Sequence, residues 1–214
     1  MARIDNLTNF LTDVATAIKD KKGTNDTIKA SDFDTEITNL PSGGSEPEKG
    51  YIINEYNSNG FPSKITIKNA GVPTYALGSY NSSSRTVISK GLTELVLPDN
   101  LSSISEGVCK YCTNLETVNF PKTLTSIGNS AFDNCKLSNV REIDFSEVTT
   151  SEKTIGTDTF AYTSIETLTI KNQSSKALEL GKYCFAYNTV MTELKLIGNI
   201  RTTGVIMDLE IIHH

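Results

Sequence analysis

A repeating alternation of apolar and polar positions fills the chain from residue 92 to residue 196. The clearest copy, LETVNFPKTLTSIGNSAFDNC at residues 115–135, opens on a leucine and alternates at Val118 and Phe120 before an Ile-Gly pair and an Ala-Phe pair. The same frame fits further copies, which open at residues 92, 115, 140, 165 and 191. A period of roughly 20 to 30 residues with one short strand per copy is typical of a leucine-rich solenoid. We therefore expect a β-solenoid of about five rungs.

A hairpin pattern precedes the repeats. Residues 51–56 and 63–68 alternate as strands do, and Asn57-Ser58-Asn59-Gly60 lies between them. An Asn-Gly step between two extended runs is a strong signal for a β-hairpin. An open solenoid end exposes apolar core and unpaired backbone, so we expect this hairpin to cap the solenoid.

Three further segments flank the regular copies. Residues 65–80 contain a worn copy of the Ile-Gly-x-x-Ala-Phe segment and predict a degenerate first rung. Residues 81–91 are polar and predict a loop insertion, whereas residues 204–212 predict a terminal strand or cap. The histidines at 213 and 214 end the sequence, and we place no metal site on them.

The first forty residues have a different pattern. Apolar residues spaced three and four apart predict a helix over residues 4–18, with the stripe Ile4, Leu7, Leu11, Val14 and Ile18. This stripe either packs on the following segment, a second short helix that begins near Ser31 and ends before Pro41, or mediates self-association. Residues 41–50, PSGGSEPEKG, have the composition of a linker. The expected fold is mixed α+β: a helical attachment or oligomerisation segment (1–40), a linker (41–50) and a capped solenoid (51–214).

Composition narrows the function classes. The net charge of −5 and the absence of a basic run argue against nucleic-acid binding. No stretch of about 18 apolar residues occurs, so we expect no membrane insertion. The N-terminal sequence lacks the pattern of a cleaved secretion signal.

The cysteines align with structural columns of the repeat. Cys109-Lys110-Tyr111-Cys112 is a CxxC motif, but Cys109 falls on the column of Phe132, which must point into the core. Cys112 and Cys135 share the next column, where a disulfide is conceivable and small residues that satisfy the turn backbone are the favoured interpretation. Cys184 falls on the column of Ala131. We expect no metal and no cofactor.

Acidic residues recur where the strands begin, but they build no catalytic site. The alignment puts three glutamates in one column and two in the column before it: Glu94, Glu142 and Glu193, then Glu116 and Glu166. Carboxylates two rungs apart are about 10 Å apart at strand spacing, which is too far for a retaining glycosidase and marginal for an inverting one. We interpret them as a solvated face. No nucleophile–base pair can be assembled, so we expect no catalytic residues and no enzyme activity.

One exposed column is a candidate ligand surface. The alignment brings together Tyr111, Asn134, Tyr162 and Tyr187 in a turn at one edge of the repeat. Aromatic rows on a rigid scaffold can stack on sugar rings or anchor a partner protein. The alternative is that these tyrosines lie along the turn and cover the core.

The repeat resembles the BspA-type leucine-rich repeat, which occurs in bacterial surface proteins and in phage structural proteins. The N-terminal segment, with a short helix, a Lys-Gly step, IKASDF and a Gly-rich linker, resembles tail or fibre proteins of phages that infect Gram-positive bacteria. These resemblances imply a non-enzymatic virion protein, a fibre or a tail or head appendage, that displays a binding surface for host attachment.

The same resemblances imply the partners. They are other virion proteins, through the N-terminal helices, and a host surface protein or glycan. A homo-oligomer is expected, with a trimer favoured. The alternative is a bacterial cell-surface adhesin or protein-interaction module, located outside the cell or on its surface rather than in the virion.

Overall fold

The chain divides into two units, Met1–Glu48 and Lys49–His214. The computed structural model describes residues 51–68, 76–84 and 86–207, all in the second unit. The helices predicted within residues 1–40, the linker and the N-terminal apolar stripe lie outside the described residues.

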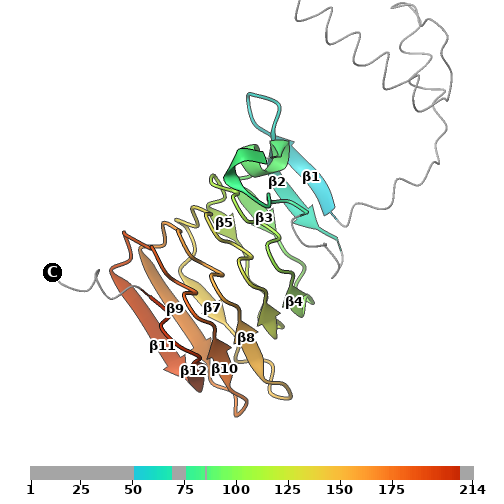
Figure 1. Cartoon of the computed structure of the whole chain (residues 1–214). Helices are drawn as coiled ribbons and strands as arrows, with labels where there is room; N and C mark the ends of the chain where they lie inside the picture. Colours follow the sequence, from blue (N-terminus) through green and yellow to red (C-terminus); the bar gives the residue numbers. More distant parts are fainter. Residues whose placement is uncertain (1–50, 69–75, 85, 208–214) are drawn as a thin grey trace, which may run out of the picture. The chain divides into compact units, whose positions relative to one another are not determined.

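The described part is a β-solenoid (Figure 1). Each of five rungs contributes one strand to one side and a second strand to the opposite side, and a turn closes the rung. In chain order the elements are β1 (Tyr51–Tyr56), β2 (Pro62–Ile67), η2 (Ser82–Ser84), α3 (Val87–Gly91), β3 (Glu94–Val96), β4 (Ser103–Ile104), β5 (Thr117–Val118), β6 (Ser126–Ile127), β7 (Glu142–Asp144), β8 (Lys153–Ile155), β9 (Thr167–Asn172), β10 (Leu178–Leu180), β11 (Glu193–Gly198) and β12 (Ile200–Thr202).

All contacts between rungs are parallel. One side consists of two sheets, β1-β2-β3-β5 and β7-β9-β11, and the other side is the single sheet β4-β6-β8-β10-β12. Leucine, isoleucine and valine side chains alternate along these short strands and point between the two sides. A rung therefore buries its apolar residues only against its neighbours, as the repeat predicted.

The predicted hairpin is confirmed. β1 pairs antiparallel with β2, and β2 pairs in parallel with β3 of the first regular rung. The amide nitrogen of Gly60 donates to Asn57 O at 2.9 Å, which closes the turn between the strands. The hairpin thereby covers one end of the solenoid (Figure 1).

The turns extend the hydrogen-bond ladder around the third side of the rungs. Amide nitrogens of Cys109, Phe132 and Phe160 donate to the carbonyl oxygens of Ala131, Thr159 and Cys184, at distances of 2.9, 3.0 and 2.8 Å. Inside these turns the rings of Phe132, Phe160 and Phe185 stack, with centroids 5.7 and 5.5 Å apart. The expected inward-facing phenylalanine column is therefore present, and Cys109 occupies its first regular position.

The degenerate first rung is supported by its described part. Leu77 is fully buried, and its amide donates to Val108 O at 3.1 Å. Val108 directly precedes Cys109, just as Ala131, which accepts from Cys109 N, directly precedes Phe132. Leu77 thus has the position that Phe132 has two rungs later. The remainder of this copy, residues 69–75, lies outside the described residues.

One flanking prediction needs correction, and a second is tested only in part. Residues 81–91 are not simply a loop, because they include η2 and the short helix α3, whose first turn is capped when Thr86 Oγ1 accepts from Ser89 N at 3.1 Å. Of the predicted terminal strand or cap at residues 204–212, the structure describes residues 204–207, which form no strand. Their backbone continues the turn ladder instead, with Val205 O accepting from Tyr183 N at 2.7 Å. The fifth copy also completes its second strand, β12, which the sequence pattern did not reveal.

Glycines set how closely the rungs approach. A Cβ placed on Gly128 would lie 2.5 Å from Glu106 N on the neighbouring rung, and one on Gly181 would lie 2.6 Å from the carbonyl carbon of Gly156. Because these neighbours are backbone atoms, side-chain rearrangement cannot relieve the clash. The glycines that follow the second strand in the three middle copies, Gly128, Gly156 and Gly181, therefore follow from the rung spacing. Ser105 and Thr203 occupy this position in the first and fifth copies.

We expect Gly128→Ala to lower the free energy of unfolding by about 1–3 kcal/mol, since overpacking forces backbone movement. Urea unfolding followed by circular dichroism measures this change. Gly204→Ala is the matched control, because its Cβ would meet only the flexible side chain of Lys182, at 3.0 Å. A Gly128→Ala variant as stable as the control would contradict the proposed spacing constraint.

Candidate functional site

The predicted ligand surface, which we call the tyrosine row, occupies one position of each turn. Its members are Tyr111, Asn134, Tyr162 and Tyr187. All four have left-handed backbone conformations, with φ of 62°, 59°, 54° and 58°. The row is continuous from rung to rung. Tyr111 N donates to Asp133 O and Tyr162 N donates to Ala186 O, both at 2.9 Å, and each acceptor directly precedes the next row member.

This backbone conformation suits asparagine and does not suit tyrosine. The left-handed region costs an ordinary L-residue roughly 1–2 kcal/mol because Cβ approaches the following carbonyl oxygen, and asparagine tolerates it best after glycine. A second left-handed position comes four residues earlier in the same turns, at Gly107, Ser130, Asp158 and Tyr183. Both conformations are needed to fold the turn back into the next strand.

The tyrosine side chains differ in exposure along the row. Tyr162 and Tyr187 are each 52% exposed, and their rings stack with centroids 4.3 Å apart and planes 11° apart. Tyr111 is half-buried, with Lys110 Nζ 5.6 Å from its ring centroid. The interpretation that the tyrosines only cover the core thus applies best to Tyr111, whereas Tyr162 and Tyr187 present half of their surface outward.

A polar cluster lies beside the row at its N-terminal end. Lys110 Nζ forms an ion pair with Asp133 Oδ2 at 2.7 Å, and Asn134 Nδ2 donates to Asp133 Oδ1 at 2.6 Å. Burial, followed by repulsion from Asp133, raises the pKa of Asp158, and Lys110 opposes this shift. In the next two rungs the positions of Lys110 and Asp133 are taken by Ala161 and Ala186, both buried.

The cysteines have structural positions, and all four are free thiols. Cys135 Sγ donates to Cys109 O at 3.1 Å, and Cys112 Sγ donates to Leu77 O at 3.6 Å. Two rungs further on, the same column holds Asn188, whose Nδ2 donates to Phe160 O at 3.0 Å. Three members of the column therefore bind a carbonyl of the rung before, whereas Thr163 Oγ1 donates to Phe160 O of its own rung at 3.1 Å. A column that satisfies the turn backbone is the favoured interpretation of the sequence.

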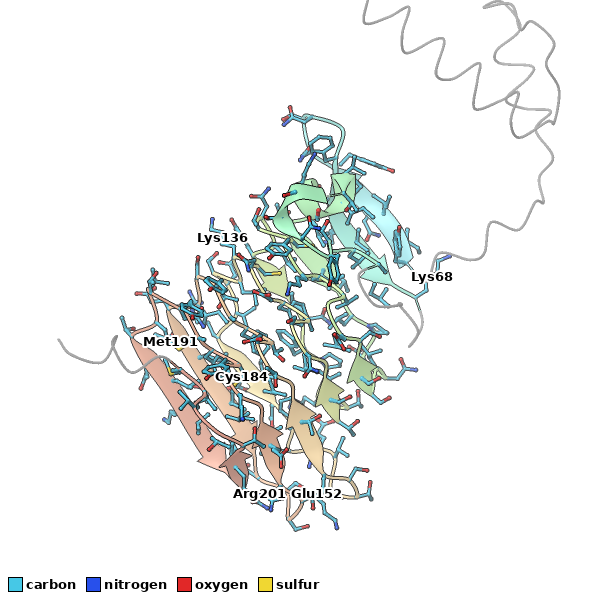
Figure 2. All side chains as sticks on the ribbon, viewed as in Figure 1. Lys68, Lys136, Glu152, Cys184, Met191 and Arg201 are labelled. Atoms are coloured by element: carbon cyan, nitrogen blue, oxygen red, sulfur yellow. The ribbon has the colours of Figure 1, made fainter. Side chains whose placement is uncertain are left out.

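Burial suppresses the acidity of these thiols. It raises the pKa of Cys109 and Cys135 well above the ordinary value, and neighbouring cysteines add to the shift. Burial also raises the pKa of Cys184 to about 12. Figure 2 places Cys184 in the interior, where it is fully buried. Thiols of this kind are poor nucleophiles and poor metal ligands.

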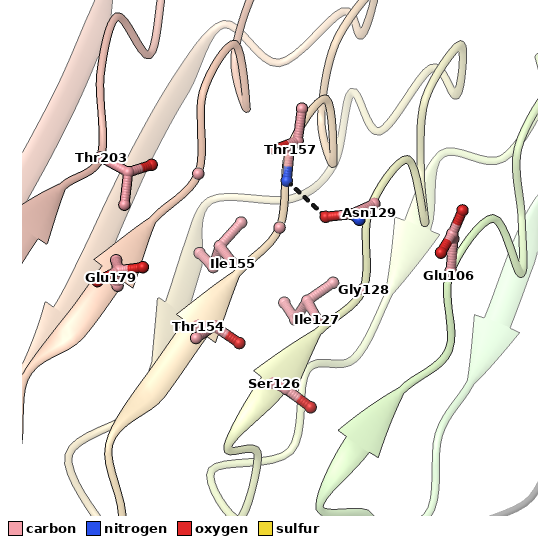
Figure 3. A pocket seen from close by; sticks show the side chains of 12 residues that line it. Glu106, Ser126, Ile127, Gly128, Asn129, Thr154, Ile155, Thr157, Glu179 and Thr203 are labelled. Atoms are coloured by element: carbon pink, nitrogen blue, oxygen red, sulfur yellow. Dashed lines mark hydrogen bonds between the residues drawn. The ribbon is translucent and has the colours of Figure 1, made fainter.

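A shallow depression of about 370 Å³ lies on the side formed by β4, β6, β8, β10 and β12. Figure 3 shows Gly128, Ser126 and Thr154 between Glu106 on one side and Glu179 on the other, and Gly156 also lines the depression. Asn129 Oδ1 accepts from Thr157 N at 2.9 Å. The glycine amides here already donate within the rung ladder, for example Gly156 N to Ile127 O at 2.8 Å. The depression is thus a consequence of the glycine column, and its polar lining has no aromatic member.

The family comparison agrees with this architecture. A model described as "BspA type Leucine rich repeat region" matches residues 83–204 in six copies, more than half of the chain. The chain belongs to the BspA-type leucine-rich-repeat family. No curated protein and no solved structure matches it.

The BspA-type rungs also explain the acidic residues, with one correction. Glu94 and Glu142 form cross-strand ion pairs with Lys64 and Lys171, at 2.9 and 2.6 Å. Glu142 does not share a row with Glu193, because it pairs with Thr169, whereas Glu193 pairs with Thr167. The β7–β9 pairing is thus shifted by two residues relative to the alignment. The shift follows an irregular segment between β5 and β7, in which Leu137 has a φ of 50°.

Two further observations concern the described residues only. No three His, Cys, Asp or Glu side chains among them gather as a metal site would require. No helix in residues 51–68, 76–84 and 86–207 has the length and apolar character needed to cross a membrane. The docking candidates Ile4, Leu7, Leu11, Val14 and Ile18 fall outside these ranges.

Sequence reasoning missed Tyr183 and the Lys110–Asp133 ion pair. Tyr183 is 46% exposed and has a φ of 56°. Its alignment with Gly107, Ser130 and Asp158, three residues common in turns, was the available signal. The ion pair had no such signal, since its two members have alanine counterparts in the following rungs.

The thiol pKa values predict a pH dependence of stability. Cys184 stays protonated in the folded chain up to about pH 12 but loses its proton near pH 9 when unfolded, so unfolding is favoured as pH rises through this window. We expect Cys184→Ala, which introduces the residue of the Ala131 column, to reduce the loss of stability above pH 9 by about 1.4 kcal/mol per pH unit.

Urea unfolding at pH 7 to 10 under reducing conditions measures how the free energy of unfolding of the wild type and of Cys184→Ala changes with pH. Below pH 8 the two proteins should show the same pH dependence. Parallel curves above pH 9 would show that the Cys184 thiol is not protected by burial.

Proposed function

We propose that this BspA-type protein is a non-enzymatic binding protein whose solenoid displays the tyrosine row to a partner. The observation that carries the proposal is the exposed stack of Tyr162 and Tyr187 at left-handed backbone positions. Asn134 occupies the same position on another rung, so the turn does not require an aromatic side chain. Exposed aromatic rings on a rigid scaffold are typical anchors for a partner.

We further propose that the protein is a virion component, a fibre or a tail or head appendage, used for host attachment. Its support is the likeness of the first forty residues to phage structural proteins of Gram-positive hosts. The stripe from Ile4 to Ile18 would dock on other virion proteins or form a homo-oligomer, for which a trimer is favoured. Several copies of one weak site would then bind a cell with high avidity.

The second candidate is a bacterial cell-surface adhesin or protein-interaction module. The BspA-type repeat favours it, because this repeat also occurs in bacterial surface proteins. Both candidates use the solenoid in the same way and differ in what the N-terminal segment contacts. Tail or capsid genes beside this gene would favour the virion protein, and their absence would favour the adhesin.

We expect the full chain to self-associate through its N-terminal stripe. Light scattering after size-exclusion chromatography should give a mass above the 23.3 kDa of one chain. Leu7→Asp combined with Leu11→Asp should restore the monomer, because a charge at an a/d seam is costly to bury. A monomeric full-length protein would exclude self-association and leave docking on a different protein.

We expect replacement of both exposed row tyrosines to weaken attachment to host cells. Tyr162→Asn with Tyr187→Asn copies the Asn134 turn, so the backbone keeps a residue that tolerates its conformation. Loss of two anchors should reduce cell binding by about tenfold or more. The readout is the pull-down of fluorescently labelled protein with whole Gram-positive cells.

Tyr56→Ala is the matched control. Tyr56 is 62% exposed on β1 and does not belong to the row. If the row variant binds cells as well as the wild type does, or if Tyr56→Ala weakens binding equally, the tyrosine row is not the binding surface.

A further inference from the structure

The surroundings of the exposed tyrosines are polar. Two residues after each row member, the chain places an exposed polar side chain: Thr113, Lys136, Ser164 and Thr189. The alanines just before Tyr162 and Tyr187 are buried and contribute little to the surface. Among the described residues two or three places after the row, Val190 is the single exposed aliphatic side chain, 47% exposed.

This setting does not match the centre of a protein interface. Anchors in protein–protein interfaces lie in apolar patches that exclude water and are depleted of charge. Two places after Tyr162 and Tyr187 the chain carries the hydroxyl groups of Ser164 and Thr189, and the exposed apolar neighbours in sequence are Tyr183 and Val190. Aromatic rings beside polar side chains suit a ligand that has apolar C–H faces and many hydroxyl groups, which is the chemistry of a sugar.

The polar cluster at the other end of the row adds oriented hydrogen-bonding groups. The Asp133 carboxylate is held by Lys110 Nζ at 2.7 Å and by Asn134 Nδ2 at 2.6 Å. The side chains of Lys110 and Asp133 are only 18% and 9% exposed, so the carboxylate and the ammonium group are fixed in position. The buried ion pair thus holds the partly exposed Asn134 amide in place, and this amide can bond to a sugar hydroxyl without further ordering.

The row is elongated, so its shape suits an extended ligand. Its members advance one rung at a time along the solenoid, roughly 5 Å at strand spacing. The left-handed backbone and the ring stack of Tyr162 on Tyr187 fix two aromatic side chains before any ligand arrives, which lowers the entropy lost on binding. A chain molecule that lies along the row would meet rings at one end and the polar cluster at the other.

We propose that the tyrosine row binds a glycan chain, with sugar rings against Tyr162 and Tyr187 and a hydroxyl group bonded to the Asn134 amide, which Asp133 holds in position. This inference rests on the proposed function, because it names the ligand class of the proposed binding surface. The probe is wall polysaccharide extracted from Gram-positive bacteria, and the protein is the full chain.

Affinity electrophoresis in gels that contain this polysaccharide tests the inference. We expect retardation of the wild type and of Tyr56→Ala, and about tenfold weaker retardation of Tyr162→Asn with Tyr187→Asn. Asp133→Asn should also weaken retardation. Periodate cleaves the vicinal diols of sugars, so periodate-treated polysaccharide should retard none of the proteins. The chain has no tryptophan, so tyrosine fluorescence gives a second readout, which the polysaccharide should change in the wild type.

Two results would overturn the glycan inference: a wild type that is not retarded, or a row variant that is retarded as strongly as the wild type. Binding to whole cells after protease or periodate treatment separates this failure from failure of the proposed function. If protease treatment of the cells abolishes binding and periodate treatment does not, the attachment function stands and the partner is a protein. If the polysaccharide retards the protein but the protein does not bind cells, the glycan site stands and the proposed role in host attachment fails.

Discussion

The hydrogen-bond ladder between rungs is the constraint on which the rest of the structure depends. It runs along both strand-bearing sides and continues through the turns, where Phe132 N donates to Thr159 O and Phe160 N donates to Cys184 O. Rungs joined on three sides have one common spacing, near that of β-strands. Every column must satisfy this spacing, so the phenylalanine rings stack, the Ile-Gly step lacks a Cβ, and a small polar group or thiol binds the previous carbonyl. The repeat in the sequence is the consequence of this one distance.

The same constraint fixes backbone conformations that the side chains do not favour. Each turn needs two left-handed residues, and three of the four row positions carry tyrosine. The stack of Tyr162 on Tyr187 offsets part of this strain, because an aromatic pair contributes about 0.5–1.5 kcal/mol. The cost of a left-handed non-glycine residue is of the same order. The tyrosines therefore give the fold little net stability, while Asn134 meets the same backbone requirement without strain.

The sequence predicts the structure best where the copies of the repeat keep a constant number of residues between equivalent positions. The inward phenylalanine column and the positions of Cys109 and Cys184 follow from a period that the ladder preserves, and the hairpin cap follows from its local Asn-Gly turn signal. The row of Glu142 with Glu193 failed where the period is broken, since the extra residues around Leu137 shift the register by two. The left-handed φ of Tyr162 had one trace in the sequence, its alignment with Asn134. Tyrosine itself gives no such signal, because its intrinsic preference is for extended backbone. The short helix α3 depends on a single cap at Thr86, too local for a pattern to reveal.

In this solenoid the interior and the candidate surface are separable. The interior columns are set by contacts with the neighbouring rungs, so a change at Gly128 or Phe160 affects the spacing of the whole stack. A row position is set only by its backbone conformation, and its side chain points away from the ladder. A polar residue, a half-buried ring and two exposed rings all occupy it on the same backbone. The turn accepts asparagine at this position, so it does not require an aromatic side chain, and at Tyr162 and Tyr187 the rings form an ordered, exposed pair.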